Sequence, residues 1–311
     1  MKILQKLFLF SLLAISLAFA RQGKLSSTVY FHYAVQWTKG IAPENRFEIS
    51  RAYLTYGNKL SPALSFKWQA DVGRLSDSLD SRLIVYLKNA LIRWKHRHLV
   101  LTLGLQTMNI FRVQEKNWGY RFIEKSAMDR KKFASSADLG IGAQWTWSKN
   151  MLIDFQISNG TGYKKSENDR YKKYSFLLLY GASRLNKKGG FNLGIVGSYE
   201  PYRRAGLHSQ HLFGFFGGFA NRFLRLGVEA NRLQNQAGQI LLSVYSAFRL
   251  SPPIILWTRF DYYQTDQTQE RYALLGFLYR MSGHFQLAPN VRLLSARLQT
   301  VRLGLHFQYT F

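Results

Sequence analysis

The sequence predicts an all-β protein, specifically a transmembrane antiparallel up-and-down β-barrel of about 16 strands. Three observations predict this class: apolar and polar side chains alternate along many segments, a short apolar leader opens the chain, and an aromatic residue closes it. In a membrane barrel alternate residues face lipid and lumen, so the strands have a two-residue period. Such strands need no long apolar run, which agrees with a mean hydropathy of −0.19.

The first 20 residues have the three parts of a secretory signal peptide. Lys2 and Lys6 form a basic start, an apolar run follows, and Ala18-Phe19-Ala20 provides a small-x-small cleavage site. The apolar run is too short for a spanning helix, which needs about 20 residues. We therefore expect a cleaved signal peptide at 1–20 and a barrel formed by 21–311, with a retained N-terminal anchor as the alternative.

The last segment is the clearest strand. Between Val301 and Phe311 every odd position is apolar or aromatic, and every even position is polar, charged or glycine. Four further segments alternate in the same way, at 64–73, 138–147, 151–158 and 224–231. These segments run to about 9–11 residues, the length that crosses a bilayer at a tilt. The strands of a soluble β-sandwich, which is the alternative, have about 5–6 residues.

The C-terminal residues Tyr309 and Phe311 lie on the apolar face of this last strand. A terminal strand that ends on an aromatic residue resembles the assembly signal of bacterial outer-membrane proteins. We therefore expect both residues to be recognised by the barrel-assembly machinery, and we expect the protein to reside in the bacterial outer membrane.

Short polar turns are expected to join the strands at one end of the barrel, as is typical of the periplasmic end. Three of them have similar sequences: Leu60-Ser61-Pro62, Leu250-Ser251-Pro252 and Leu287-Ala288-Pro289. Proline suits a turn because it lacks the donor that a strand interior requires. Further turns of this kind are expected at 95–98, 148–150, 184–190 and 221–222.

Longer connections are expected at the opposite end. They are predicted at 38–45, 75–82, 108–136, 160–173, 200–208, 233–238 and 264–269, with a tight last hairpin near 295–297. The strands between these breaks number about sixteen, an even number in the range of channel-forming barrels. A barrel of this size encloses an aqueous channel, whereas a barrel of about eight strands would fill with side chains.

The chain carries 43 Lys and Arg against 17 Asp and Glu, a formal net charge of +26. Such a charge predicts anionic partners, and export argues against nucleic acid. The remaining candidates are the phosphates of lipopolysaccharide and other outer-membrane lipids outside the barrel, and small anions inside it. The chain has no cysteine and its seven histidines are scattered, so neither a metal site nor a cofactor is expected.

Basic residues at lumen-facing positions of the predicted strands are candidates for an anion pathway, because a channel selects charge through the potential of its wall. The basic residues in this phase are Arg51, Lys67, Arg225, Arg249, Arg259, Arg292 and Arg302, and those chosen as pathway candidates are Arg51, Lys67, Arg225, Arg259 and Arg302. Acidic residues occupy the same faces, for example Asp261 two positions after Arg259. Structural ion pairs are therefore the alternative role for each of these arginines.

The segment 108–136 is too long for a hairpin turn, and loops of this length usually carry function. Its seven basic and three acidic residues give it a net charge of +4. It also holds Trp118, Tyr120 and Phe122, which a fully solvated loop would not need. We expect the segment to fold into the lumen, with an external loop that binds lipopolysaccharide as the alternative. The basic residues expected to face passing anions are Arg121, Lys125 and Arg130.

Several stretches between 45 and 165 follow one another in a characteristic order and spacing. They are Phe47-Glu48-Ile49-Ser50-Arg51-Ala52-Tyr53-Leu54 with Gly57, Lys88-Asn89-Ala90 with Trp94 and Gly104-Leu105-Gln106, Glu115-Lys116-Asn117-Trp118-Gly119-Tyr120-Arg121, Ser136-Ala137-Asp138-Leu139-Gly140, and Asn159-Gly160-Thr161-Gly162-Tyr163. Together they resemble the phosphate-selective porin O and P family of outer-membrane proteins. The resemblance implies a sixteen-stranded barrel, commonly a homotrimer, with loops folded into a channel that conducts anions or phosphate past arginines and lysines.

From these observations we expect a porin for the passive diffusion of small anions, phosphate among them, and hence an ion-transport role without catalysis. A non-conducting structural or adhesion barrel that binds lipopolysaccharide through its basic loops is the alternative. An enzyme is not expected: His208, Ser209 and His211 lie close in sequence, but no nucleophile motif accompanies them.

Overall fold

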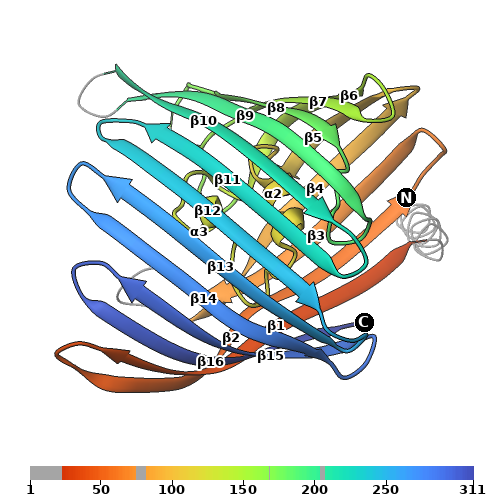
Figure 1. Cartoon of the computed structure of the whole chain (residues 1–311). Helices are drawn as coiled ribbons and strands as arrows, with labels where there is room; N and C mark the ends of the chain where they lie inside the picture. Colours follow the sequence, from red (N-terminus) through yellow and green to blue (C-terminus); the bar gives the residue numbers. More distant parts are fainter. Residues whose placement is uncertain (1–22, 75–81, 168, 204–206) are drawn as a thin grey trace, which may run out of the picture.

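The computed structural model describes residues 23–74, 82–167, 169–203 and 207–311, and the expected signal peptide at 1–20 lies outside this part of the chain. Sixteen antiparallel strands form one closed barrel, in which β16 pairs with β1 (Figure 1). The predicted fold class and strand number are therefore confirmed. The strands are β1 (Lys24–Thr38), β2 (Ile41–Lys59), β3 (Leu64–Arg74), β4 (Leu83–His96), β5 (Leu99–Thr107), β6 (Ala137–Thr146), β7 (Met151–Ser158), β8 (Lys173–Gly181), β9 (Gly190–Arg203), β10 (Leu207–Ala220), β11 (Leu224–Gln234), β12 (Gly238–Arg249), β13 (Ile254–Thr265), β14 (Gln269–Arg280), β15 (Phe285–Ser295) and β16 (Gln299–Thr310).

The alternation places apolar side chains on the outside of the barrel. On β11, for example, Leu226 and Val228 are exposed, whereas Glu229 and Asn231 are buried on the inner side. Every strand has at least one large apolar side chain exposed in this way. A continuous apolar surface of this size is unfavourable in water and suits the hydrocarbon of a bilayer.

Many of the exposed aromatic side chains gather near one end of the barrel, where β1 begins and β16 ends. They include Trp68, Trp94, Trp145, Trp147, Tyr180, Phe191, Phe223, Phe248, Tyr279, Tyr309 and Phe311. Aromatic girdles of this kind mark the level of the lipid headgroups in membrane barrels.

The closure between β1 and β16 is well formed. Phe31 and Phe307 face each other across the two strands, and their rings stack with centroids 4.7 Å apart. The terminal Phe311 continues this ladder, because it donates to Ser27 at 3.2 Å and accepts from the same residue at 3.0 Å. The last residue of the chain is thus part of the seam that closes the barrel.

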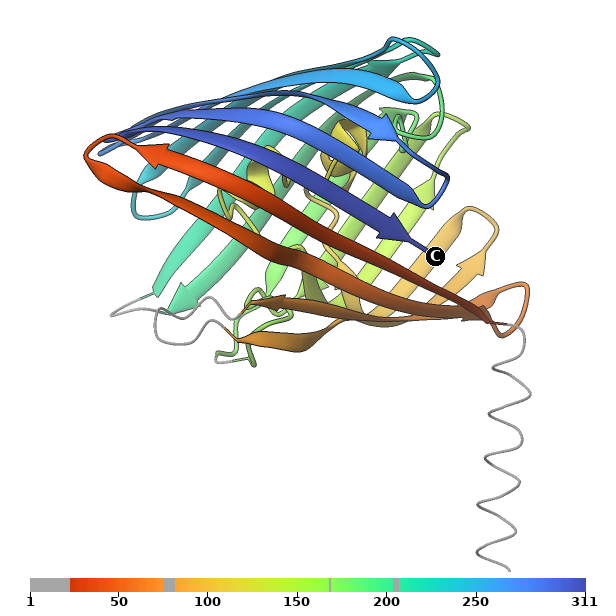
Figure 2. The same ribbon diagram turned by 90° about the horizontal axis from the view of Figure 1, so that it is seen from below.

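Seven connections of two to eight residues lie at the end where β1 begins and β16 ends, here called the turn end (Figure 2). The turns predicted at 60–62 and 250–252 are confirmed. The turn predicted at 287–289 is wrong, because these residues lie within β15. The β14–β15 pairing is interrupted at Pro289, and such a gap tolerates a residue that has no N–H.

At the opposite end, here called the loop end, several connections are shorter than expected. The segments 38–45, 233–238 and 264–269 reduce to connections of two or three residues, and 200–208 also lies largely within β9 and β10. Their polar residues continue the strands as hairpins; Asn45, for example, pairs with Val35. The prediction of long loops is wrong here because a strand that projects beyond the bilayer is polar on both faces, as a loop is.

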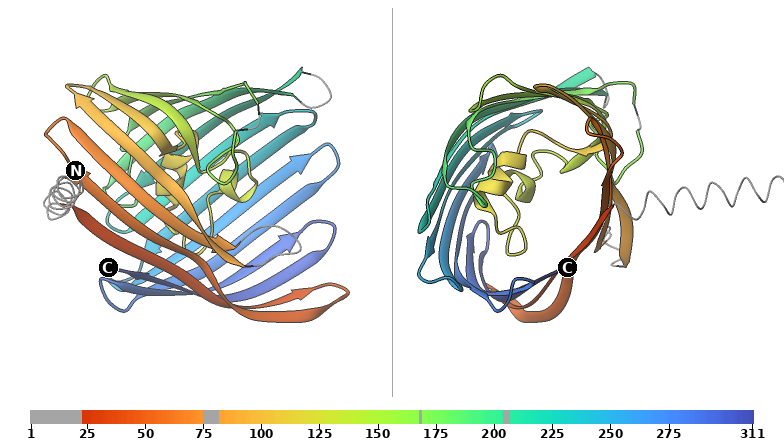
Figure 3. Two further views of the ribbon diagram at one scale, coloured as in Figure 1. Left: turned by 180° about the vertical axis from the view of Figure 1, so that it is seen from behind. Right: turned by 90° about the vertical axis from the view of Figure 1, so that its right-hand side faces the viewer.

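The segment 108–136 lies inside the barrel and contains the short helices α2 (Arg112–Trp118) and α3 (Ala127–Arg130). Figure 3 shows it within the barrel outline, against the green and blue strands of the wall. Neither helix, nor any other in the described residues, is long and apolar enough to cross a membrane.

Candidate functional site

The inner loop, residues 108–136, leaves the wall after β5 and returns at β6. Its two ends lie side by side, because the Met108 N–H donates to the Ser136 carbonyl at 3.2 Å. The buried side chain of Asn109 donates to the Asp154 carboxylate at 3.1 Å and accepts from the Ser175 hydroxyl at 2.9 Å. These bonds direct the chain inward from a fixed point on the wall.

One part of the inner loop packs on the inner face of β8–β12. Phe111 and Phe133 are almost completely buried there. The wall residues that receive this part of the loop are Leu177, Leu179, Val196, Leu212, Phe216, Leu233 and Leu241. Burial of each large apolar side chain contributes about 1.5–3 kcal/mol. This part of the lumen wall is therefore apolar, although barrel interiors are usually polar.

A second apolar contact holds the loop to β12–β15. Trp118 is 1% exposed, and its ring lies edge-on to Tyr245 at 5.5 Å and to Trp257 at 6.0 Å. Edge-to-face packing of this kind adds about 0.5–1.5 kcal/mol to each pair beyond the buried area. The aromatic residues that the sequence placed in the loop thus attach it to the wall.

Helix α2 ends at Gly119, close to the turn end of the barrel. Gly119 has a φ of 74°, and a Cβ there would lie 2.9 Å from Asn186 and 3.0 Å from the guanidinium of Arg225. Only glycine fits such a left-handed, crowded position without strain. Arg225 donates to the Trp118 carbonyl at 2.8 Å. The inner loop therefore extends through the lumen as far as the turn at 182–189.

Five of the eight predicted pathway cations have a carboxylate within ion-pair distance, and four of them have it at 3.6 Å or less. Arg51 pairs with Asp71 (3.6 Å), Arg121 with Asp129 (2.5 Å) and Glu115 (2.9 Å), Arg130 with Glu270 (2.8 Å) and Asp261 (3.3 Å), and Arg259 with Asp261 (2.7 Å). The pairs of Arg130 join the inner loop to β13 and β14. These cations stabilise the arrangement of loop and wall, and most of their charge is balanced.

The other four predicted cations have weaker or neutral partners. Lys67 donates to Asn89 (2.7 Å) and Gln69 (3.2 Å), Arg225 to the Trp118 carbonyl (2.8 Å) and Arg302 to His32 (2.6 Å), while Lys125 lies 4.0 Å from Asp129. The Lys125 side chain is 40% exposed, the most accessible of the inner-loop cations in an ion pair. Lys67, Arg225 and Arg302 therefore keep uncompensated positive charge within the barrel, and Lys125 is only weakly paired.

A buried carboxylate, Asp71, organises the wall toward the loop end. It accepts from the Tyr163 hydroxyl at 2.8 Å and lies 3.4 Å from the ammonium of Lys88. Burial and the adjacent Asp71 raise the pKa of Tyr163, so the phenol keeps its proton and remains a donor. Tyr163 thereby fastens the connection between β7 and β8 to the inner wall.

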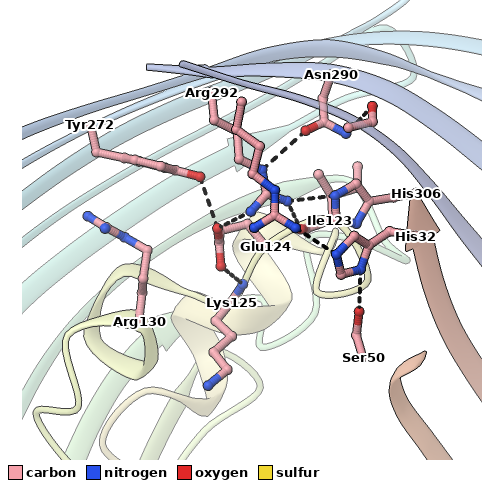
Figure 4. Close-up of polar contacts among 12 residues, drawn as sticks. His32, Ser50, Ile123, Glu124, Lys125, Arg130, Tyr272, Asn290, Arg292 and His306 are labelled. Atoms are coloured by element: carbon pink, nitrogen blue, oxygen red, sulfur yellow. Dashed lines mark hydrogen bonds and ion pairs between the residues drawn. The ribbon is translucent and has the colours of Figure 1, made fainter. Parts of the chain in front are cut away.

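The tip of the inner loop is clamped by Glu124 (Figure 4). Its carboxylate accepts from Arg292 at 2.8 Å and from the Tyr272 hydroxyl at 2.9 Å, and Arg292 also donates to the Ile123 carbonyl at 2.5 Å. Burial alone raises the pKa of Glu124, but the charges of Arg292, Arg259 and Arg130 outweigh it and hold the pKa at about 2. Glu124 is therefore ionised at neutral pH.

Two arginine–histidine pairs lie beside this clamp, and Figure 4 shows Arg292 with His306 and His32. Arg292 and Arg302 face each other across β15 and β16, and His32 and His306 face each other across β1 and β16 with rings 4.8 Å apart. Arg292 contacts His306 Nε2 at 2.8 Å. Arg292 and Arg302 concentrate positive charge where the loop tip meets the wall. This arrangement is unfavourable in itself, because like charges directly opposite each other in a sheet repel.

A cavity of about 170 Å³ lies between the loop tip and the β16–β1–β2 wall. The predicted residues Arg51, Arg121, Lys125 and Arg302 all line it. Arg292 and the histidines also line it but were missing from the predicted site. The alternation does place Arg292 on the lumen side of β15, but Arg292 was not among the chosen pathway candidates.

A larger cavity, here called the turn-side vestibule, lies between α2 and the β2–β8 wall and measures about 480 Å³. Its basic residues are Lys59, Arg93, Lys95, Arg112, Lys116 and Arg184. None of them was in the predicted site. Arg93 was not predicted to face the lumen, because a register shift in the β3–β4 pairing interrupts the two-residue period. Lys88 and Asn89 are both buried as a result. Arg184 lies in a turn, where no alternation indicates whether a side chain faces the lumen.

No protein-family model matches the chain, and no curated protein matches it. Solved structures do. An anion-selective porin from Comamonas acidovorans superposes with a TM-score of 0.69 and 9% identity, over 93% of this chain and 99% of the porin. The chain has the fold of the bacterial porins.

Two further structures are similar. The outer-membrane channel DcaP of Acinetobacter baumannii matches with a TM-score of 0.69 and 9% identity, over 93% of this chain and 97% of DcaP. The trimer form of OmpT, an outer-membrane protein of Vibrio cholerae, matches with a TM-score of 0.67 and 10% identity, over 93% of this chain and 99% of OmpT. At such identities the similarity establishes the fold. The closed barrel, its apolar outer surface and this fold place the protein in the bacterial outer membrane.

Proposed function

We propose that the protein is an outer-membrane porin for the passive diffusion of small anions, phosphate among them. The observation that carries the proposal is the positive charge within the lumen that is uncompensated at Lys67, Arg225 and Arg302 and only weakly paired at Lys125. A pore needs no catalytic group, only a wide enough lumen and a wall potential that favours one sign of charge. The resemblance of several stretches to phosphate-selective porins supports the same solute class.

The inner loop supports the proposal as a constriction. It fills the lumen beside β8–β15 and leaves Lys125 and Arg302 at the cavity beside β16, β1 and β2. A cation about 5 Å from an anion in water contributes about 0.8 kcal/mol, and three converging cations about 2.5 kcal/mol before screening by salt. Such a constriction would favour anions severalfold to about a hundredfold.

The partners belong to the same proposal. Tyr309 and Phe311 would be recognised by the barrel-assembly machinery, and basic loops would bind lipopolysaccharide. A homotrimer is proposed from the resemblance and from the trimer form of the OmpT barrel. Ser209 and His211 lie 2.9 Å apart in an exposed position at the loop end, and no catalytic role is proposed for them.

The alternative is a non-conducting structural or adhesion barrel. The apolar packing of the inner loop favours it, because a loop held by Phe111, Trp118 and Phe133 resembles a plug. Conductance of the purified protein in a planar bilayer separates the two functions. Stable open steps with an anion-biased reversal potential support the porin, whereas a correctly folded barrel that stays silent would establish the alternative.

A further inference from the structure

The connections at the turn end carry only positive charge. Together with the last residue of the strand before each, the seven connections contain nine Lys and Arg residues and no Asp or Glu. Every connection contributes at least one of them: Lys59, Arg97, Lys149, Arg184, Lys187, Lys188, Arg222, Arg249 and Arg280. At the loop end, by contrast, both signs occur, for example Glu167 with Arg170 in the β7–β8 connection.

The turn-side vestibule has the same imbalance inside the barrel. Six cations and one carboxylate line it, which leaves a net charge of +5. The carboxylate, Asp154, is occupied by Arg112 at 2.5 Å. In the described residues, no carboxylate lies within ion-pair distance of the other five cations, which are Lys59, Arg93, Lys95, Lys116 and Arg184.

The vestibule also offers neutral donors. The amides of Gln106 and Gln144 and the hydroxyl of Thr102 line it, whereas the amide of Gln156, which also lines it, already donates to Gln106 and to the Thr107 carbonyl. The Nε2 donor of Gln106 is buried, and no acceptor reaches it within the described structure. A buried donor without an acceptor is unfavourable, so an oxygen-bearing solute in this cavity would satisfy a group that the protein leaves unsatisfied.

The cations converge on the vestibule from separate elements. Lys59 comes from β2, Arg93 from β4, Lys116 from α2 and Arg184 from the β8–β9 turn. An anion with one charge can approach only part of such a set, whereas an anion with two or three charged groups can approach several cations at once. Burial and the neighbouring Arg112 and Arg184 lower the pKa of Lys116 to about 8. The lowered pKa of Lys116 thus reflects its burial first and the neighbouring positive charge second.

We propose that the turn-side vestibule is a binding site for small multivalent oxyanions, such as di- or tricarboxylates and condensed phosphates. This inference deepens the proposed function by naming a solute class, and it rests on that function for delivery of the solute through the barrel. The positive charge of the turn-end connections would attract the same anions toward the opening at that end of the barrel. Anions with a single charge would bind there much more weakly.

Titration calorimetry on the full chain in neutral detergent tests the site directly, with citrate, pyrophosphate and nitrate as separate probes at fixed ionic strength. We expect citrate and pyrophosphate to bind at one site and nitrate to give no measurable heat. The double variant Arg93→Gln/Lys116→Gln should weaken citrate binding at least about tenfold, since two nearby charges are lost. The matched control Arg97→Gln/Lys149→Gln removes the same charges from turns outside the vestibule and should bind as the native protein does.

Proton uptake gives a second, more specific measurement. At pH 8 bound citrate should raise the pKa of Lys116, so that binding takes up protons, detected by repeating the titration in buffers of different ionisation enthalpy. Lys116→Arg should retain binding and lose this uptake. Absence of citrate binding, equal binding of nitrate, or equal weakening in the control pair would each overturn the site.

Conductance distinguishes failure of this site from failure of the porin. A barrel that conducts anions but does not bind citrate keeps the proposed function and loses the site. A barrel that binds citrate but passes no current keeps the site and loses the proposed function. In a conducting barrel, citrate added from the turn end should block current more strongly than citrate added from the loop end, and Arg93→Gln/Lys116→Gln should remove this difference.

Discussion

Arg292 and His306 are joined by a contact of 2.8 Å between a guanidinium nitrogen and the imidazole Nε2 atom. A guanidinium can only donate, so this Nε2 atom accepts and the ring proton lies on Nδ1, which faces the Phe122 carbonyl at 3.1 Å. His32 has the same arrangement between Arg302 and the Ser50 hydroxyl. The attachment of the loop tip therefore requires two neutral histidines beside two arginines.

Acidification should loosen the loop tip, because protonation of either ring places a new cation against Arg292 and Arg302. The other charged groups near this cluster are the carboxylates of Glu124 and Glu48 and the guanidinium of Arg46. We expect larger current fluctuations at pH 5 than at pH 7 in bilayer recordings. His32→Gln/His306→Gln keeps one acceptor and one donor at each site and should remove most of this pH response; an unchanged response would exclude the histidines as its source.

Glu124→Gln should release the loop tip at neutral pH. The pKa of Glu124 is depressed to about 2, so its contribution is complete above the ordinary carboxylate range and is lost as the pH falls through about 2. The depression corresponds to about 3 kcal/mol for the docked loop. Limited proteolysis of the inner loop should therefore accelerate in Glu124→Gln, and the surface control Glu167→Gln should behave as the native protein does.

Trp118→Ala should weaken the second apolar contact of the loop by about 3–5 kcal/mol. The strand ladder does not depend on this contact, so the barrel itself should still fold, as its migration in an unheated gel would report. We expect larger or more variable single-channel conductance because the loop leaves the wall. Trp147→Ala is the control, since that ring is 67% exposed on the outer surface. Identical conductance in the two variants would contradict the role of Trp118.

Lys125→Gln should reduce the anion preference without loosening the loop, because its nearest carboxylate lies 4.0 Å away. Loss of one cation about 5 Å from the solute reduces the preference at most about fourfold before screening. Arg121→Gln should change both properties, since it leaves Asp129 and Glu115 without their 2.5 and 2.9 Å partner. The reversal potential in a salt gradient measures the preference, and proteolysis of the loop measures its attachment. A Lys125→Gln reversal potential equal to that of the native protein would remove Lys125 from the pathway.

The fold was predictable because lipid outside and water inside impose a strict two-residue period. That period gave the class and the strand number, and it placed Arg259 and Arg302 on the inner side. It failed where the chemistry of the two faces is alike. Hairpins such as 38–45 project into water on both faces, and their strands therefore have the composition of loops.

The site was less predictable because charge partners come from distant parts of the chain. Arg130 meets Asp261 and Glu270 only after the inner loop has crossed the lumen, a pairing that no sequence spacing reveals. The alternation that assigned the other basic residues to the lumen face does not reach two residues. Arg184 lies in a turn, and Arg93 follows an irregularity in the β3–β4 pairing. The apolar inner face of β8–β12 was unexpected for a lumen wall, yet the aromatic residues of the loop required such a surface.

The apolar attachment of the inner loop to β8–β15 has a consequence for how the barrel tolerates change. The wall beneath the loop is a hydrophobic core with a loop on one side and lipid on the other. Substitutions there, such as at Leu241 or Trp257, should act as in the interior of a soluble protein and depend on volume and shape. The wall from β16 through β1 to β7 borders the cavities, so side chains there that take no part in a buried ion pair, unlike Asp71 and Asp154, can vary in charge and size at little cost to folding. One sheet thus combines a half fixed by apolar packing with a half whose unpaired positions are free to adapt to different solutes.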